Sequence, residues 1–110
     1  DLKVVTPSGK EKTIEVKYDI MSSRTGNVAV EMWKEPNGKK VKAGLLASKS
    51  TFYAYSFPSD DSFYFIKTSR LKQIINLQEY DRLVMGGDGG IYKIALFNKD
   101  KFISKCTPIS

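Results

Sequence analysis

The segment TIEVKYD, residues 13–19, decides the fold prediction, because apolar and charged side chains alternate along its whole length. Successive side chains of a β-strand point to opposite faces of a sheet, so the segment predicts a strand with one apolar and one charged face. The apolar set is Ile14, Val16 and Tyr18, and the charged set is Glu15, Lys17 and Asp19. We predict that the apolar set points into a core and that this strand lies inside a sheet.

The charged face of this strand has two interpretations. It is either a solvated face with a charge pair, as is common on edge strands, or one wall of a metal-dependent active site. The first interpretation requires only that the charged side chains contact solvent, whereas the second requires further carboxylates on neighbouring elements. The rest of the sequence bears on this choice.

Alternating and helical patterns elsewhere predict the remaining elements. A short strand joined through a Pro-Ser-Gly-Lys turn makes a hairpin with the strand at 13–18, and a Pro-Asn-Gly turn follows a third strand. Apolar residues at helical spacing from Gly44 to Phe57 predict a helix that ends before Pro58. The predicted strands are 2–5, 13–18, 27–33 and 62–67, and the predicted helices are 44–57 and 69–76.

The C-terminal part begins with a glycine-rich loop, Gly86–Gly90, which we interpret as a flexible turn that carries Asp88. The loop lacks the spacing of a nucleotide-binding P-loop. Two apolar segments at 91–97 and 101–105 predict further strands. The order of elements predicts one α/β or α+β domain over residues 1–110, with a mixed central sheet and flanking helices.

The amino-acid composition excludes several classes of catalytic and metal-binding site. The chain has 110 residues, 18 Lys and Arg against 12 Asp and Glu, a single cysteine (Cys106) and no histidine. Without histidine, Ser-His-Asp and Cys-His catalysis and His-containing zinc sites are excluded, and a hard cation held by oxygen, Mg²⁺, is the natural metal. The formal charge of +6 favours a polyanionic partner. We expect a cytoplasmic protein in a prokaryotic or viral setting, with no membrane association.

A hairpin brings its two strands together, so Asp1 at the start of the first strand can lie close to Glu15 and Lys17 on the second. Two carboxylates and one lysine suit phosphodiester hydrolysis. The carboxylates hold Mg²⁺, and the lysine orients or deprotonates a water and stabilises the developing negative charge.

These residues resemble the D…(D/E)xK motif of the PD-(D/E)XK nuclease superfamily, with Asp1 followed by Glu15-Val16-Lys17. The pattern EVKYD…TGNVAVE…G…SK…YAY is similar to small phage-type endonuclease-like proteins. The resemblance covers about residues 1–75. It implies a restriction-endonuclease-like αβββαβ core, of which this sequence shows no first helix.

The resemblance also implies roles for individual residues. Asp1 and Glu15 would be metal ligands for Mg²⁺, for which Mn²⁺ can substitute, and Lys17 would be the catalytic lysine. Lys49 matches a polar residue on the helix after the third strand, where it would contact phosphate or stabilise charge.

Two further acids, Asp19 and Glu31, are candidate ligands of a second metal or supporting groups. In a rival placement Asp19 and Glu31 are the two motif acids. Trp33 then stands where the motif lysine belongs, and Lys49 substitutes from the helix.

The expected partner is DNA. Exposed lysines near a cleft bind backbone phosphate without reading sequence. The candidate DNA-binding residues are Lys39, Lys40, Lys42 and Lys49. We therefore expect a Mg²⁺-dependent DNA endonuclease that can select branched substrates such as junctions or flaps and can form a homodimer, with a non-catalytic basic nucleic-acid-binding module as the alternative.

Overall fold

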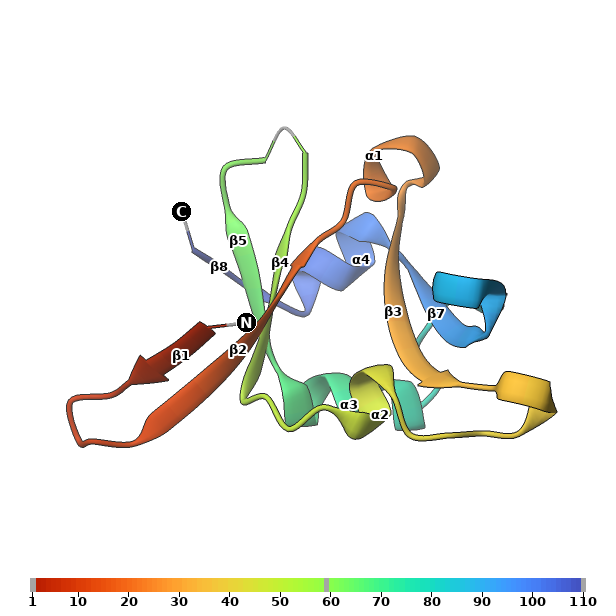
Figure 1. Ribbon diagram of the computed structural model, residues 1–110. Coiled ribbons are helices and arrows are strands. Elements are labelled where there is room, and N and C mark those ends of the chain that lie inside the picture. Colours follow the sequence, from red (N-terminus) through yellow and green to blue (C-terminus); the bar gives the residue numbers. More distant parts are fainter. Residues whose placement is uncertain (1, 59, 110) are drawn as a thin grey trace.

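The strand predicted from TIEVKYD lies inside a five-stranded sheet (Figure 1). The computed structural model describes residues 2–58 and 60–109. Strand β2 (Glu11–Tyr18) pairs antiparallel with β1 (Leu2–Val5) and parallel with β4 (Phe52–Ser56). Strands β5 (Phe63–Lys67) and β8 (Thr107–Ile109) complete the order β1-β2-β4-β5-β8. The parallel β2–β4 pair makes this a mixed sheet.

A second, antiparallel sheet has the order β3-β7-β6. Its strands are β3 (Asn27–Lys34), β6 (Arg82–Gly86) and β7 (Tyr92–Asn98). The helices are short: α1 (Ser22–Thr25), α2 (Gly44–Ala47), α3 (Thr68–Asn76) and α4 (Lys99–Ser104), with 3₁₀ turns η1 (Pro36–Gly38) and η2 (Asp88–Gly90). Figure 1 shows α2, α3 and α4 on the side of the larger sheet where β3 and β7 lie. The fold is therefore α+β, as the sequence predicts.

The hydrophobic core fills the space between the two sheets and the helices. Phe102 of α4 packs its ring edge-on against Tyr55 of β4 and Phe97 of β7, with ring centroids 4.8 and 5.5 Å apart. Leu71 of α3 and Leu45 of α2 are buried in the same cluster. Residues from both sheets and three helices therefore share one core, and each element depends on the others for its buried surface.

The prediction of which face of β2 is buried was wrong. Val16 and Tyr18 are 38% and 61% exposed, and the charged face is the one that turns toward the second sheet. The parallel register explains the reversal, because Glu15 lies beside Tyr53 and Lys17 beside Tyr55, both of which are buried. The alternation identifies which side chains share a face, but the partner strand decides which face is covered.

The predicted helix over residues 44–57 was also wrong beyond its first turn. Only Gly44–Ala47 is helical, and FYAYS of β4 forms a strand between β2 and β5. Aromatic side chains favour a strand, and Tyr53, Ala54 and Tyr55 are all buried, which hides the period-2 pattern.

The other predicted elements agree more closely. The strands at 2–5, 13–18, 27–33 and 62–67 and the helix at 69–76 are confirmed, although 27–33 belongs to the second sheet. The segment 101–105, predicted as a strand, lies largely in helix α4. The Asn98 side chain caps this helix by accepting a hydrogen bond of 3.2 Å from the Lys101 amide. No described helix is both long enough and apolar enough to span a membrane.

Truncation of a core leucine tests the shared core. Leu71 is 0% exposed and Leu77, at the end of the same helix, is 59% exposed. Leu71→Ala should lower the free energy of unfolding by about 2–5 kcal/mol through lost burial and the cavity left behind. Leu77→Ala is the matched control and should change it by about 0.5 kcal/mol or less. Urea unfolding of both variants makes the comparison, and equal effects would contradict this core.

Candidate functional site

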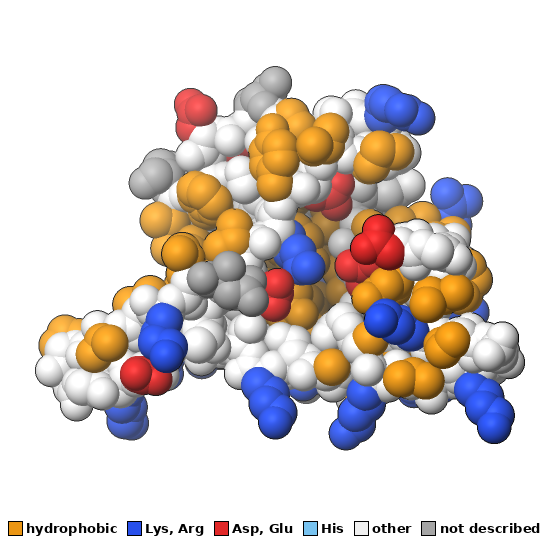
Figure 2. Space-filling view, viewed as in Figure 1, with side chains coloured by type: hydrophobic (Ala, Val, Ile, Leu, Met, Phe, Trp, Pro, Cys, Tyr) orange, Lys and Arg blue, Asp and Glu red, His pale blue; other side chains and the backbone are white. Residues whose placement is uncertain are grey.

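A pocket with several charged groups in a largely apolar lining lies where the two sheets separate. Strand β2 ends in the larger sheet, the chain turns through α1, and β3 begins in the smaller sheet, so the two strands form the walls of a fork (Figure 1). The pocket between them has a volume of about 350 Å³. Figure 2 shows acidic and basic side chains gathered around this hollow. The polar and charged residues that line it are Lys17, Tyr18, Asp19, Glu31, Tyr53 and Tyr55, and apolar residues, among them Ile20, Met21, Val30 and Ile94, form much of the remaining lining.

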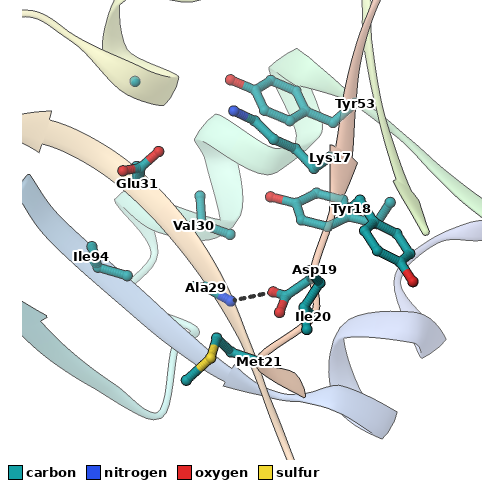
Figure 3. A pocket seen from close by; sticks show the side chains of 12 residues that line it. Lys17, Tyr18, Asp19, Ile20, Met21, Ala29, Val30, Glu31, Tyr53 and Ile94 are labelled. Carbon is teal, nitrogen blue, oxygen red and sulfur yellow. Dashed lines mark hydrogen bonds between the residues drawn. The ribbon is translucent and has the colours of Figure 1, made fainter. Parts of the chain in front are cut away.

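Glu15 and Lys17 form the β2 side of the site. The Lys17 Nζ lies 3.7 Å from Glu15 Oε2, and the side chains are 42% and 25% exposed respectively. Figure 3 shows Lys17 and Tyr53 pointing from their strands into the hollow. A pair this exposed contributes at most about 1 kcal/mol to stability, so both charged groups remain accessible to a ligand.

Glu31 of β3 forms the opposite wall, held between two glycines. A Cβ at Gly87 would lie 2.7 Å from Glu31 Oε2, and a Cβ at Gly44 would collide with the Glu31 carbonyl oxygen. Gly87 and Gly44 have positive φ angles, +70° and +52°, which residues other than glycine rarely adopt. The backbone therefore approaches Glu31 closely on two sides. From the sequence, the Gly86–Gly90 loop is expected to be only a flexible turn, and this contact is not predicted.

The pKa of the Tyr53 phenol is affected by carboxylates of both sheets. Burial raises the pKa of its phenol most strongly, a hydrogen bond with Ser48 lowers it, and the negative charges of Glu15 and Glu31 raise it further. The net shift of the pKa is upward, so the phenol is neutral and able to donate a hydrogen bond at physiological pH. Both carboxylates therefore act on one hydroxyl. Tyr53 was predicted on a helix as a core residue, and only the β2–β4 pairing reveals its place here.

Asp19 joins the two walls at the base of the fork. Its Oδ1 accepts a hydrogen bond of 3.0 Å from the Ser22 amide, and its Oδ2 accepts one of 3.2 Å from the Ala29 amide at the start of β3 (Figure 3). Both carboxylate oxygens are thus engaged with backbone. These two hydrogen bonds give Asp19 a structural role, because they join the end of β2 to the start of β3. Its role as a metal ligand stays a prediction.

The predicted DNA-binding lysines lie elsewhere on the surface. Lys39, Lys40 and Lys42 are exposed in the loop between η1 and α2, and the Lys40 ammonium lies 3.9 Å from the centre of the Trp33 ring. Lys49 is exposed and follows α2 in a loop, not in the predicted helix. None of these lysines is among the residues that line the pocket.

In the alternative placement of the motif acids, Asp19 and Glu31 replace Asp1 and Glu15. These two acids line the same pocket as Lys17. Trp33 does not: its indole Nε1 donates a hydrogen bond of 2.7 Å to Glu35. Asp1 lies outside the described residues, and its predicted role stays a prediction.

The carboxylate oxygens of the site are the type of ligand that a hard cation such as Mg²⁺ prefers. Mg²⁺ prefers carboxylate oxygens and usually keeps several waters, so one or two protein carboxylates suffice. Glu15 and Glu31 carry such oxygens, and both are close enough to the Tyr53 phenol to raise its pKa. Within residues 2–58 and 60–109 no cluster of three or more His, Cys, Asp or Glu side chains is arranged to hold a metal.

Comparisons of the chain with protein-family models, curated proteins and solved structures gave no match. Any functional conclusion therefore depends on the residues of the pocket.

Removal of the Asp19 carboxylate tests the bridge. Asp19→Ala leaves the Ser22 and Ala29 amides without their acceptor and should cost about 2–4 kcal/mol of unfolding free energy. Native-state hydrogen exchange should quicken most at these two amides. Asp61→Ala, at an exposed position, is the control. Unchanged exchange at the Ala29 amide would show that Asp19 does not hold the fork.

A pair of glycine substitutions tests the close contact on Glu31. Gly44 and Gly9 both have positive φ, but only Gly44 has another residue in the space that a Cβ would take. Gly9→Ala should cost about 1–2 kcal/mol of unfolding free energy, the cost of the left-handed conformation alone. Gly44→Ala should cost roughly 3 kcal/mol or more, because the backbone at Glu31 must also shift. Urea unfolding measures both costs, and equal values would contradict the contact.

Proposed function

We propose that the chain is a Mg²⁺-dependent DNA endonuclease built on a restriction-endonuclease-like core. The observation that supports the proposal is that Lys17 of one sheet and Glu31 of the other line the same pocket, with Glu15 paired to Lys17 beside it. Carboxylates and a lysine around one pocket are a set that phosphodiester hydrolysis needs and that a histidine-free chain can supply.

Each residue has a distinct task in this proposal. Glu15 and Glu31 would hold the cation, which would offset the charge that develops on the phosphoryl oxygens and would activate water. Lys17 stays in the pocket through its pairing with Glu15, where its ammonium can contact the scissile phosphate or orient the attacking water. The neutral Tyr53 phenol can donate a hydrogen bond to a phosphate oxygen.

The surface charge supports a polyanionic substrate. The net charge is +6, and Figure 2 shows Lys and Arg side chains spaced along the lower margin of the face that contains the hollow. Lys39, Lys40, Lys42 and Lys49 are exposed and available for phosphate contacts. We include in the proposal Mn²⁺ as a substitute metal and intracellular DNA processing in a prokaryote or its virus as the setting.

The alternative function is a non-catalytic nucleic-acid-binding module on the same core. It is favoured by one observation: among the described residues, no three His, Cys, Asp or Glu side chains are grouped so that they could hold a metal. Both functions predict DNA affinity that falls with salt, but only the endonuclease predicts cleavage that depends on a metal.

Cleavage of labelled linear, flapped and four-way DNA tests the endonuclease. With Mg²⁺ or Mn²⁺, Glu15→Gln, Glu31→Gln and Lys17→Met should each lower the rate by roughly 10²–10⁴-fold, since each removes a charge at the reacting phosphate. Glu11→Gln, which alters an exposed β2 residue paired with Lys3, is the matched control and should retain activity. EDTA should abolish cleavage.

The outcomes separate the two functions. Wild-type cleavage that survives all three pocket substitutions would contradict the proposed site. Salt-sensitive binding without cleavage in either metal would favour the binding module.

A further inference from the structure

The outer face of the five-stranded sheet is apolar and uncovered. The strand registers place alternate residues of β1, β2, β4, β5 and β8 on this face, opposite the pocket. Nine large apolar side chains lie there, six of them exposed and three half-buried. They are Leu2, Val4, Ile14, Val16, Tyr18, Phe52, Phe63, Phe65 and Ile109.

The described helices all pack on the other side of this sheet. Leu71 of α3 and Phe102 of α4 are buried with Tyr53, Tyr55 and Ile66, which point inward. Helices α1 and α2 contact β3 of the second sheet. An apolar surface that extends over five strands is unusual for a monomer and indicates an interaction surface.

Basic and acidic side chains lie at opposite ends of this face. Lys12 and Lys67 lie on the outer face at the end where β2 and β4 begin, with Arg70 beside Lys67. Lys67 and Arg70, together with Lys105, border a groove of about 480 Å³ that Phe52 and Phe65 also line. Asp61 is exposed at the opposite end, in the loop between β4 and β5, whereas the Asp60 carboxylate accepts a hydrogen bond from the Tyr64 hydroxyl on the inner side of the sheet. One end of the face is thus basic through Lys12 and Lys67, and the other is acidic through Asp61.

We propose that this face is the contact surface of a homodimer, in which two copies pack their outer sheet faces together as a β-sandwich. A twofold axis that lies in the interface, across the strands, places the basic end of each copy over the acidic end of its partner. The apolar side chains of both copies then fill the layer of about 10 Å between the sheets. Charge complementarity therefore favours a second copy as the occupant.

This interface leaves Lys17, Asp19 and Glu31 of each pocket accessible, because they lie on the inner side of the sheet, although Tyr18 of the outer face also borders the pocket. It does not depend on the proposed endonuclease activity. Loss of the dimer and loss of cleavage are consequently separate results.

Sedimentation velocity of the wild-type chain between about 1 and 100 µM tests the proposal, since a specific interface of this kind should hold a dimer in that range. Val16→Lys and Phe63→Lys should each weaken the dimer by tenfold or more, because each buries an unpaired charge. Leu83→Lys, on an exposed position of β6 in the other sheet, is the matched control and should leave the dimer unchanged.

A charge exchange tests the orientation of the two copies. Lys67→Asp should weaken the dimer by placing acid against Asp61 of the partner copy, and adding Asp61→Lys in the same chain should restore it. A wild-type monomer at every concentration would overturn the proposal, even if a hydrophobic dye or single-stranded DNA bound the face. A dimer insensitive to Val16→Lys and Phe63→Lys would overturn it as well.

Discussion

The carboxylate of Asp19 joins two sheets at the point where they separate, and the candidate site depends on this bridge. One oxygen accepts the Ser22 amide, which starts the turn after β2, and the other accepts the Ala29 amide of β3. The edge of β3 therefore stays beside the end of β2 without pairing with it as a strand. Above this junction the strands diverge, and the space between them is the pocket in which Glu31 faces Lys17. Without the bridge, these side chains would belong to two unrelated surfaces.

The polar inner face of β2 is stable because it remains partly hydrated. Burial of a charged pair in a dry core costs several kcal/mol per ion, whereas Glu15 and Lys17 keep a quarter or more of their side-chain surface in solvent. Deeper in the same layer, β4 contributes Tyr53 and Tyr55 and then Phe57, so polarity decreases from the pocket toward the core. The same sheet thus positions a charged site and contributes to the hydrophobic core.

The sequence predicts this arrangement in part. Alternation from Thr13 to Asp19 places Glu15, Lys17 and Asp19 on one face, which the structure confirms, but the same alternation cannot tell which face is covered. That depends on the parallel pairing of β2 with β4, a contact between segments almost 40 residues apart with no local signal. The strand β4 has the pattern of a helix because its successive residues Tyr53, Ala54 and Tyr55 are all apolar or aromatic and buried, which hides the period of two. The contact of Gly87 with Glu31 also joins distant segments, and only the excess of glycine at 86–90 gave a signal for it.

The central claim is that carboxylates from two sheets form one cation site beside Lys17. Paramagnetic broadening of amide NMR signals by substoichiometric Mn²⁺ tests it most directly, because the ion broadens only nuclei near its binding site. The account predicts that signals of Glu15–Lys17, Glu31 and Gly87 broaden together, and that Glu31→Gln reduces the effect on β2 as well as on β3. Broadening confined to other acids, such as Asp60 or Glu79, or no broadening at all, would contradict the account.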